Sequence, residues 1–596
     1  MQVPRPEYPR PQFVRADWLC LNGSWQFEID HADTGLERGL LNRPLKQKIT
    51  VPFCPESELS GIGHTDYMAA VWYRKEVTIP KKWNGNRVLL HFQAVDYDAT
   101  IWVNGREVTR HRGGFTPITA DLSGVAWPGE KVTIVVRARD PHRTPMPSGK
   151  QSHQYANHAC MYTRTTGIWQ TVWMEPVSET YLQRPRITPY ATHGCVHVEL
   201  PIVGQRKGYH VQMALSDAEG VVDAAGTPAD MDFTARLGVA IPPKRKRLWS
   251  PEDPYLYDLR IELTDPSGKT VDELASYVGM RSISIDGPAV KLNGKPVFQR
   301  LVLDQGYYAD GILTAPSDKA LVGDIQLSME AGFNGARLHQ KIFEERFLYH
   351  ADRMGYLVWG EYPDWGCNTM GVEGDNQQPT ASYITEWAEA IERDYSHPAI
   401  VGWCPLNETW QKLTDRITQL DVITRGMFLV TKGMDTTRPV IDASGYSHRV
   451  LETDIYDCHD YEQDPGKFAT NHAGLAEGKP FQNQGWNGVH PLNFPYRGQP
   501  FFVSEFGGIW WNPDAKPGED SWGYGDRPKT LKEFHERFDK LCAVLLDNKL
   551  MFGYCYTQLT DVYQEQNGIY HFDRRPKFDM NKIRKAQQRP AAIEAT

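Results

Sequence analysis

Hydrophobic and polar residues alternate with a period of two in many short runs over the first part of the chain. Residues 71–79, 88–92 and 99–103 show this alternation, and turn dipeptides such as Asn104-Gly105 separate the runs. A period of two is typical of antiparallel strands that bury one face and expose the other. We therefore predict a β-sandwich or jelly roll over residues 1–180.

A second β-rich segment is expected from residue 181 to residue 285. It lies between Pro-containing segments and includes the alternating runs 196–200 and 257–263. Its length of about 100 residues suits an immunoglobulin-like β-sandwich. The chain is therefore predicted to begin with two different β domains.

From residue 286 onward, short apolar runs alternate with segments of helical periodicity. Apolar residues four positions apart, such as Trp387 and Ile391, or Phe534 and Phe538, indicate one buried face of a helix. The apolar runs predict eight strands, at residues 297–303, 335–338, 356–359, 400–404, 439–441, 454–458, 501–504 and 551–556. Eight strand–helix alternations over about 300 residues indicate a (β/α)8 TIM barrel for residues 286–596.

Length and charge limit the classes of protein and partner. The chain of 596 residues exceeds the roughly 250–300 at which single cores stop growing, so three domains are expected. The net charge of −9 argues against a nucleic-acid partner, and basic clusters such as residues 243–247 are short and isolated. No run approaches the ~18 consecutive apolar residues of a membrane span, so no membrane partner is expected.

The N-terminus and the cysteines bear on the cellular compartment. Residues 1–7 contain no apolar signal core, which favours a cytoplasmic protein. The nine cysteines show no C-x-x-C spacing and fit reduced, buried thiols better than a disulfide framework or a zinc site. Formation of a homo-oligomer is left open.

Two glutamates follow apolar strands and open onto sequence that is rich in Trp and Gly. Glu408 closes the run 402–408, and Glu505 closes the run 501–505. Active sites of TIM barrels lie at the carboxyl ends of the strands, so acids after strands four and seven can serve one site. Glycosidic bond cleavage needs one carboxyl group to protonate the leaving oxygen and another to attack the sugar. Each glutamate alone could instead be an ordinary strand-end acid bonded to a neighbouring Lys or Arg.

Several motifs, in order along the chain, resemble those of glycoside hydrolase family 2, the family of β-galactosidases, β-glucuronidases and β-mannosidases. Residues 21–27 resemble the opening of the family's sugar-binding jelly roll, and residues 166–170 resemble its closing strand. Residues 393–408 resemble the acid/base signature and residues 503–507 the nucleophile strand. The resemblance implies a retaining mechanism in which Glu505 attacks the anomeric carbon and Glu408 acts as the acid and then the base.

The same resemblance implies roles for three further residues. Asn407 would bond the 2-hydroxyl of the sugar, Arg337 would keep the nucleophile ionised, and Tyr461 would bond the nucleophile. A loop amide that caps a turn is the alternative for Asn407. A buried structural tyrosine is the alternative for Tyr461.

The chain departs from the family's pattern where the sugar substituents are recognised. Two histidines that are customary in the family align with Gln305 and Gln340. β-Glucuronidases bind the substrate carboxylate with an Asn-x-Lys pair, whereas this chain has Glu565 and Asn567 in those places. Because a glutamate there would repel a uronate, the sequence favours a neutral sugar. Asp304 after strand one would accept sugar hydroxyls, unless it forms a strand-end salt bridge.

Tryptophans near the predicted barrel mouth are candidates for contact with a sugar. Trp rings that expose a flat face can stack on pyranose C–H groups, although buried core tryptophans are equally common. Near the predicted barrel mouth we expect Trp365, Trp486 and Trp510 to contact the substrate. We recognise no full set of metal ligands, so neither a metal nor another cofactor is predicted.

The main functional hypothesis is an exo-acting retaining β-glycosidase that removes terminal neutral sugars from an oligosaccharide or glycoside. β-D-Galactosides are the first candidate substrates and α-L-arabinopyranosides the second. The alternative enzyme is a β-uronidase of the same family that holds the substrate carboxylate through Lys341, Arg574 or Lys577. A carbohydrate-binding homologue without turnover is a further alternative, against which the presence of both glutamates argues.

Overall fold

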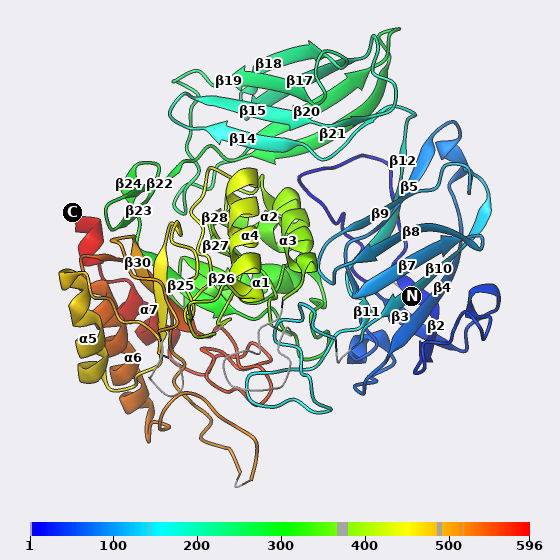
Figure 1. The fold of residues 1–596 in the computed structure, drawn as a ribbon. Helices are drawn as coiled ribbons and strands as arrows, with labels where there is room; N and C mark the ends of the chain where they lie inside the picture. The colour runs from blue at the N-terminus through cyan, green and yellow to red at the C-terminus, as the bar shows by residue number, and fades with distance from the viewer. Residues whose placement is uncertain are drawn as a thin grey trace.

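Two antiparallel sheets pack face to face in the N-terminal part of the computed structural model, coloured blue in Figure 1. The structure describes residues 3–141, 144–365, 379–409, 411–484, 491–516 and 518–595. One sheet has the order β1(Leu19–Cys20)-β12(Val172–Val177)-β5(Arg87–Phe92)-β9(Ile118–Asp121). The other has the order β3(Gln47–Val51)-β2(Gly23–Asp30)-β4(Ala70–Thr78)-β10(Lys131–Arg139)-β7(Asp98–Val103)-β8(Arg106–Arg112). Buried side chains from both sheets, such as Trp25 and Leu90, meet in one core. A short pair, β11(Gly167–Ile168)-β6(Val95–Asp96), completes this sandwich.

A second sandwich, teal and green at the top of Figure 1, follows along the chain. Its sheets have the orders β14(Arg186–Tyr190)-β15(Cys195–Leu200)-β19(Ala235–Ala240) and β18(Gly220–Pro228)-β17(His210–Asp217)-β20(Tyr257–Thr264)-β21(Thr270–Val278). Buried and exposed residues alternate along β19 and β20, which is why the sequence shows a period of two there. Short strands flank it: β13(Tyr181–Leu182)-β16(Ile202–Val203), and β22(Ile283–Asp286)-β23(Ala289–Leu292)-β24(Lys295–Pro296), which leads into the barrel.

A curled parallel sheet forms the C-terminal body. Its strand order is β28(Ile400–Cys404)-β27(Leu357–Glu361)-β26(Gly335–Leu338)-β25(Gln299–Asp304)-β31(Met551–Thr557)-β30(Phe501–Gly507)-β29(Tyr456–Asp460). The first strand, β25, pairs with the last, β31, so the sheet curls into a barrel. Every residue of β28, β30 and β31 is buried, because packing covers both faces of the sheet. These observations confirm the predicted order of sandwich, sandwich and TIM barrel.

The predicted fifth strand at residues 439–441 is wrong. Val440 forms only an isolated parallel bridge with Trp403 of β28, and Ser444 forms another with Asn407. This segment therefore fills the gap between β28 and β29 without becoming a regular strand. Pro439 has no backbone N–H to donate, which works against a regular ladder in this short segment.

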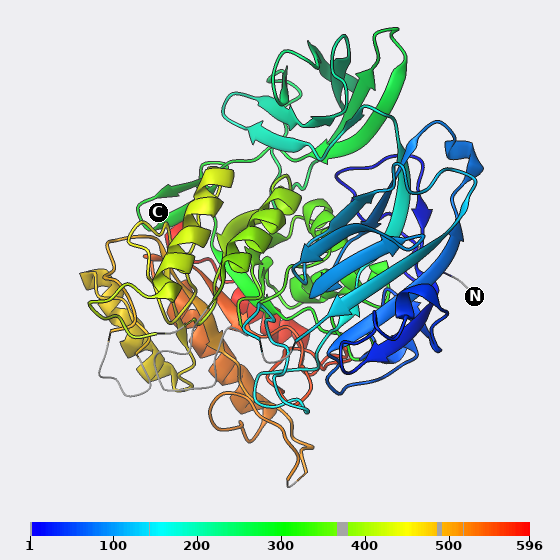
Figure 2. The same cartoon turned by 45° about the vertical axis from the view of Figure 1, so that its right-hand side comes forward.

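Helices surround the barrel strands (Figures 1 and 2). They are α1(Asp318–Glu330), α2(Glu345–Met354), α3(Ala381–Asp394), α4(Gln419–Met434), α5(Pro465–Ala473), α6(Leu531–Leu546) and α7(Met580–Gln587). Short 3-10 turns are η1(Leu40–Asn42), η2(Glu58–Ser60), η3(Lys81–Trp83), η4(Gly474–Glu477) and η5(Ala592–Ala595). In α6, Thr530 caps the N-terminus, and Phe534, Phe538 and Leu541 are buried on one face. Within the described ranges, no helix combines the length and apolar character that crossing a membrane requires.

The segment between β10 and β11 leaves the first sandwich and lies against the barrel. In both views it appears in cyan beside the red loops that follow β31 (Figures 1 and 2). Hydrogen bonds join the two parts: the Gln564 side chain donates to the carbonyls of Ala159 and Met161, at 2.7 and 3.0 Å. The first sandwich therefore contributes a segment to the barrel mouth.

Candidate active site

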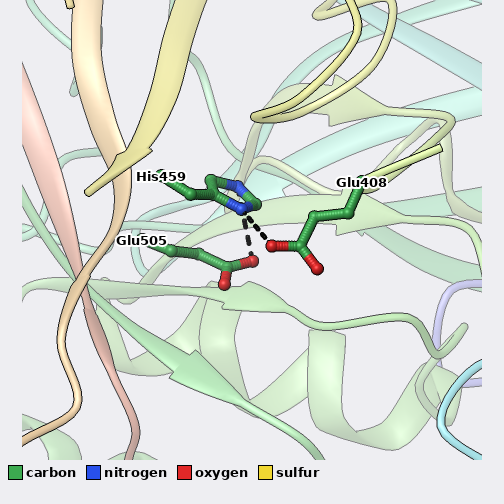
Figure 3. A group of neighbouring side chains, drawn as sticks. All are labelled: Glu408, His459 and Glu505. Carbon is green, nitrogen blue, oxygen red and sulfur yellow. Dashed lines mark hydrogen bonds and ion pairs between the residues drawn. The ribbon is translucent and has the colours of Figure 1, made fainter. Parts of the chain in front are cut away.

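Two glutamates and a histidine meet at the carboxyl ends of three barrel strands (Figure 3). Glu408 follows β28, His459 lies in β29, and Glu505 lies in β30. One carboxylate oxygen of each glutamate and one ring nitrogen of the histidine lie within 4.8 Å of one another. The structure thus brings together the two acids that the sequence singled out.

Arg337, which is fully buried in β26, ties this group together. Its Nε and Nη2 donate to Oε2 of Glu361, at 3.2 and 2.7 Å. Its Nη1 donates to the Ser504 carbonyl at 2.6 Å and lies 3.3 Å from Oε1 of Glu505. Its Nη2 also donates to Oδ1 of Asn407 at 2.9 Å. One guanidinium therefore fixes the ends of three strands and the loop after β28.

The carboxylate of Glu505 is surrounded by donors. The Tyr461 hydroxyl donates to Oε2, while Nε2 of His339 and Nε2 of His459 lie 3.3 and 3.4 Å from Oε1. Burial raises the pKa of Glu505, but the two histidines and Arg337 outweigh burial and hold this pKa well below its usual range. Glu505 is therefore ionised at neutral pH, as a nucleophile requires.

Contacts with Tyr524 and Thr557 hold Tyr461 in place. Its ring stacks on that of Tyr524, with ring centroids 3.4 Å apart and planes 3° apart. Its hydroxyl also lies 3.1 Å from Oγ1 of Thr557 in β31. The contact with Glu505 is the one that the family resemblance implied for Tyr461.

Asn407 is buried beside the glutamates and has one unused donor. Arg337 occupies its Oδ1, whereas its Nδ2 has no hydrogen-bond partner among the described residues. The Nε1 of Trp365 donates to the Asn407 carbonyl at 2.8 Å, so this predicted aromatic residue also lies at the site. A buried N–H group without a hydrogen-bond partner costs free energy, and a sugar hydroxyl could accept a hydrogen bond from Nδ2 of Asn407.

Hydrogen-bond partners place a proton between His459 and Glu408. The Ser444 hydroxyl donates to Oδ2 of Asp457 at 2.7 Å and lies 3.0 Å from Nε2 of His459. Burial raises the pKa of Asp457, but His448 outweighs burial and the pKa is about 2, so this carboxylate only accepts. The Ser444 oxygen must then accept from Nε2–H of His459. Since Nδ1 of His459 lies 2.6 Å from Oε1 of Glu408, these two atoms share one further proton.

Glu565 and Asn567, which replace the Asn-x-Lys pair, belong to a buried network. Glu565 accepts from the Tyr162 hydroxyl at 2.6 Å and from Nδ2 of Asn567 at 3.1 Å. Gln558 donates to Oδ1 of Asn567 at 2.9 Å, and Gln305 donates to Gln558 at 2.8 Å. Burial raises the pKa of Glu565. Its carboxyl group is therefore bonded on both oxygens and is not a free negative charge facing the substrate.

Three other predicted binding residues have contacts elsewhere or cannot be placed. Asp304 accepts a hydrogen bond from the Gly306 amide at 2.9 Å, and burial raises its pKa to about 7. Trp510 donates to Oγ of Ser521 at 3.1 Å. Trp486 lies outside the described residues. A substrate contact for these three stays a prediction.

The three basic residues proposed to bind a uronate already have partners within the protein. Lys341 donates to two backbone carbonyls, at 2.6 and 2.8 Å. Arg574 pairs with Asp324 at 3.1 Å, and Lys577 pairs with Asp561 at 2.7 Å. None of the three offers an uncommitted charge in the described part of the chain.

The residues of this site that sequence reasoning missed include Glu361, His459 and Lys150. Glu361 ends β27, so the rule that found Glu408 and Glu505 would also have found it. His459 lies two residues before Tyr461, which places both on the same side of an extended segment. Lys150, whose Nζ lies 4.1 Å from the centroid of the Trp365 ring, belongs to an irregular segment without a pattern.

Within the described residues, a metal ion could be held by the group of Glu408, His459 and Glu505. Each offers one ligand atom, and these atoms lie within 4.8 Å of one another. The same atoms are engaged with one another in the hydrogen bonds and ion pairs described above. The expectation of an enzyme without a metal stays a prediction.

Comparison with known proteins identifies the family. Models of glycosyl hydrolases family 2 match the chain in three parts: the sugar binding domain at residues 63–146, a second model at residues 180–281, and the TIM barrel domain at residues 304–507. The chain belongs to glycoside hydrolase family 2. The resemblance read from the motifs is therefore confirmed, and the protein is a glycoside hydrolase.

Its relatives within the family include β-glucuronidases. The β-glucuronidase of Paenibacillus borealis is 25% identical over 598 residues, which cover 94% of each chain. That of Canis lupus familiaris is 27% identical and covers 73% of this chain and 69% of its own. The β-glucuronidase of Ruminococcus gnavus, solved in complex with D-glucuronic acid, has a TM-score of 0.76 at 20% identity and covers 98% of this chain and 100% of that chain. At such identity the structural likeness shows the fold.

The hypothesis of a neutral, β-D-galactoside-type substrate is wrong, because the relatives that span most of the chain are β-glucuronidases. The hypothesis rested on the charge of Glu565. In the structure this carboxyl group is buried and bonded to Tyr162 and Asn567, so its presence does not exclude a uronate.

The first prediction concerns Glu505. The variant Glu505→Gln keeps the shape of the side chain but removes the attacking oxygen anion, so kcat/KM should fall by about 10³-fold or more without unfolding the protein. Steady-state kinetics and a thermal melt measure both effects. Glu389→Gln is the control, since this glutamate also contacts a histidine, His111, at 2.9 Å but lies on α3. A Glu505→Gln enzyme that retains a tenth of the activity would contradict the assignment.

The second prediction concerns pH. Burial lowers the pKa of His459, but the charges of Glu505 and Glu408 outweigh burial and raise it. The charge of His459 in turn lowers the pKa of Glu505, so His459→Asn should raise that pKa. The acid limb of the kcat/KM profile, where Glu505 becomes protonated, should then move to higher pH.

The matched control is His350→Asn, because His350 also contacts a carboxylate, that of Asp318, at 3.0 Å. This variant should leave the acid limb in place. An acid limb that stays fixed, or moves to lower pH, in His459→Asn would show that His459 does not set the ionisation of Glu505.

Proposed function

We propose that the protein is an exo-acting retaining β-uronidase that removes a terminal β-linked glucuronic acid from a glycoside or oligosaccharide. The observation that carries the proposed chemistry is the pair Glu408 and Glu505, in which one carboxylate oxygen of each lies within 4.8 Å of the other. Retaining glycosidases have carboxyl groups about 5–5.5 Å apart, whereas inverting enzymes need a wider gap for water. The choice of a uronide is supported by the β-glucuronidases that align over most of the chain.

In the first step, Glu505 attacks the anomeric carbon while Glu408 protonates the departing oxygen. The glycosidic C–O bond breaks as an ester bond forms to Glu505. Two features prepare this step: Glu505 is held ionised by its neighbours, and a proton lies in the contact between Glu408 and His459. The leaving alcohol takes the proton, and Glu408 is left ionised.

In the second step, Glu408 removes a proton from water, which attacks the same carbon and releases the sugar from Glu505. Each carboxyl group returns to its starting state. Esterification removes the negative charge of Glu505, so Glu408 can stay ionised and act as the base, and that charge returns when the ester breaks. Asn407 supports both steps in this proposal, because its unpaired Nδ2 is available to bond the 2-hydroxyl of the sugar.

A panel of nitrophenyl β-glycosides tests the substrate class. The kcat/KM for the glucuronide should exceed that for the galactoside and the glucoside by about 10²-fold or more, since a site that pairs a buried carboxylate discriminates against sugars that lack it. The galacturonide separates the two uronic acids in the same assay. Higher activity on any neutral glycoside than on both uronides would overturn the proposal.

Chemical rescue tests the roles of the two acids. The variant Glu408→Ala should still cleave substrates with very acidic leaving groups, because these need no proton, and added azide should restore turnover. Since azide would replace the water that attacks the glycosyl–enzyme, the product should be the β-azide. An α-azide would mean that Glu408 and Glu505 have exchanged roles.

A further inference from the structure

Lys150 reaches the active site from the first sandwich, although the family site lies in the barrel. The amides of Ser148 and Gly149 both donate to the Trp365 carbonyl, at 2.6 and 3.2 Å. Gly149 has a φ of +56°, and a Cβ there would lie 2.3 Å from the Gln340 carbonyl oxygen. Only glycine allows so close an approach. The backbone that carries Lys150 is therefore packed against the barrel loops after β26 and β27.

The side chain of Lys150 is buried but its ammonium group is not committed. The residue is 7% exposed, and Nζ lies 4.1 Å from the centroid of the Trp365 ring. In the described ranges no carboxylate oxygen lies within 4.0 Å of Nζ, unlike the cations at positions 574 and 577. Buried lysines are rare unless they are paired, and an ammonium group has three donors to fill. This geometry is that of a site that awaits an anion.

The acidic groups around Lys150 act on the charge of its ammonium group. Burial lowers the pKa of Lys150, but four acidic groups outweigh burial and raise the pKa: Cys160, Glu565, Glu408 and Glu505. The ammonium group is therefore protonated at neutral pH. It is also linked to the catalytic loop through Trp365, whose Nε1 donates to the Asn407 carbonyl.

We infer that Lys150 binds the carboxylate of the substrate's uronic acid. This inference rests on the proposed function and adds the residue that selects its substrate. Lys150 would supply the positive charge that the chain lacks at Asn567, whose amide is bonded to Gln558 and Glu565. A single buried ammonium group beside a carbohydrate site fits the carboxylate of a sugar. This carboxylate carries one negative charge, which balances the one positive charge of Lys150.

The test compares two substrates that differ only at C6, nitrophenyl β-glucuronide and nitrophenyl β-glucoside. Lys150→Met keeps most of the length of the side chain and removes the charge. It should lower the ratio of the two kcat/KM values, glucuronide over glucoside, by about 10²-fold, as the loss of a buried charge partner does. Lys150→Arg, which keeps the charge, should recover part of this ratio.

Lys75→Met is the matched control. Lys75 lies in the same sandwich, on β4, with its Nζ 5.4 Å from the centroid of the Trp25 ring. Its loss should leave the ratio unchanged. A second measurement does not depend on turnover. Calorimetry compares the binding of D-glucuronate to Glu505→Gln with and without Lys150→Met, and Lys150→Met should weaken this binding by a similar factor.

The outcomes separate the inference from the proposed function. An equal loss on both substrates, or no loss, would overturn the inference, since Lys150 would then only support Trp365 or the loop. A wild-type enzyme that does not hydrolyse the glucuronide would overturn the proposed function, and the inference with it.

Discussion

The buried guanidinium of Arg337 is the interaction on which the site depends. Taking a charge out of water costs several kcal/mol unless partners compensate, and Arg337 is fully buried. Glu361 and Glu505 supply the compensating charges, while the Ser504 carbonyl and Asn407 accept the remaining donors. Because the fork of an arginine is rigid, its partners are fixed relative to one another. Arg337 thereby fixes the position of Glu505 relative to Asn407, the residue that precedes Glu408.

Two glutamates of the same chemistry are given different states by their surroundings. Glu505 lies within a strand, and two histidines, Arg337 and Tyr461 stabilise its negative charge. Glu408 lies in the loop after β28, has a side chain that is 17% exposed, and shares a proton with His459. Environment rather than residue type thus separates the proposed nucleophile from the proposed acid. Ser444 and Asp457 extend this control, since they decide which ring nitrogen of His459 carries a proton.

The fold could be predicted where burial imposes a pattern. The predicted strands 335–338 and 400–404 coincide with β26 and β28, because parallel strands covered on both faces are rich in apolar residues. The segment 439–441 is also apolar but forms only an isolated bridge, because strand pairing depends on neighbours that a local pattern does not record. Glu408 and Glu505 were found because their positions follow from strand ends. Tyr162 could not be found this way, since it bonds Glu565 across 403 positions of sequence from an irregular segment.

The neutral-sugar hypothesis was wrong because it relied on the absence of the Asn-x-Lys pair, which describes only one place in the chain. The carboxylate of a bound uronate interacts with all the charges near it. Electrostatic forces act through space, so a cation can come from any segment that the fold brings close. Here residues 148–150 are pinned to the barrel by Trp365 and by the contact of Gly149 with Gln340. Such close packing between domains is needed if a charge from one domain must stay within reach of a substrate in the other. In the proposed function, the first sandwich is therefore part of the active site, and the interface between the sandwich and the barrel is where selectivity for the sugar carboxylate is set.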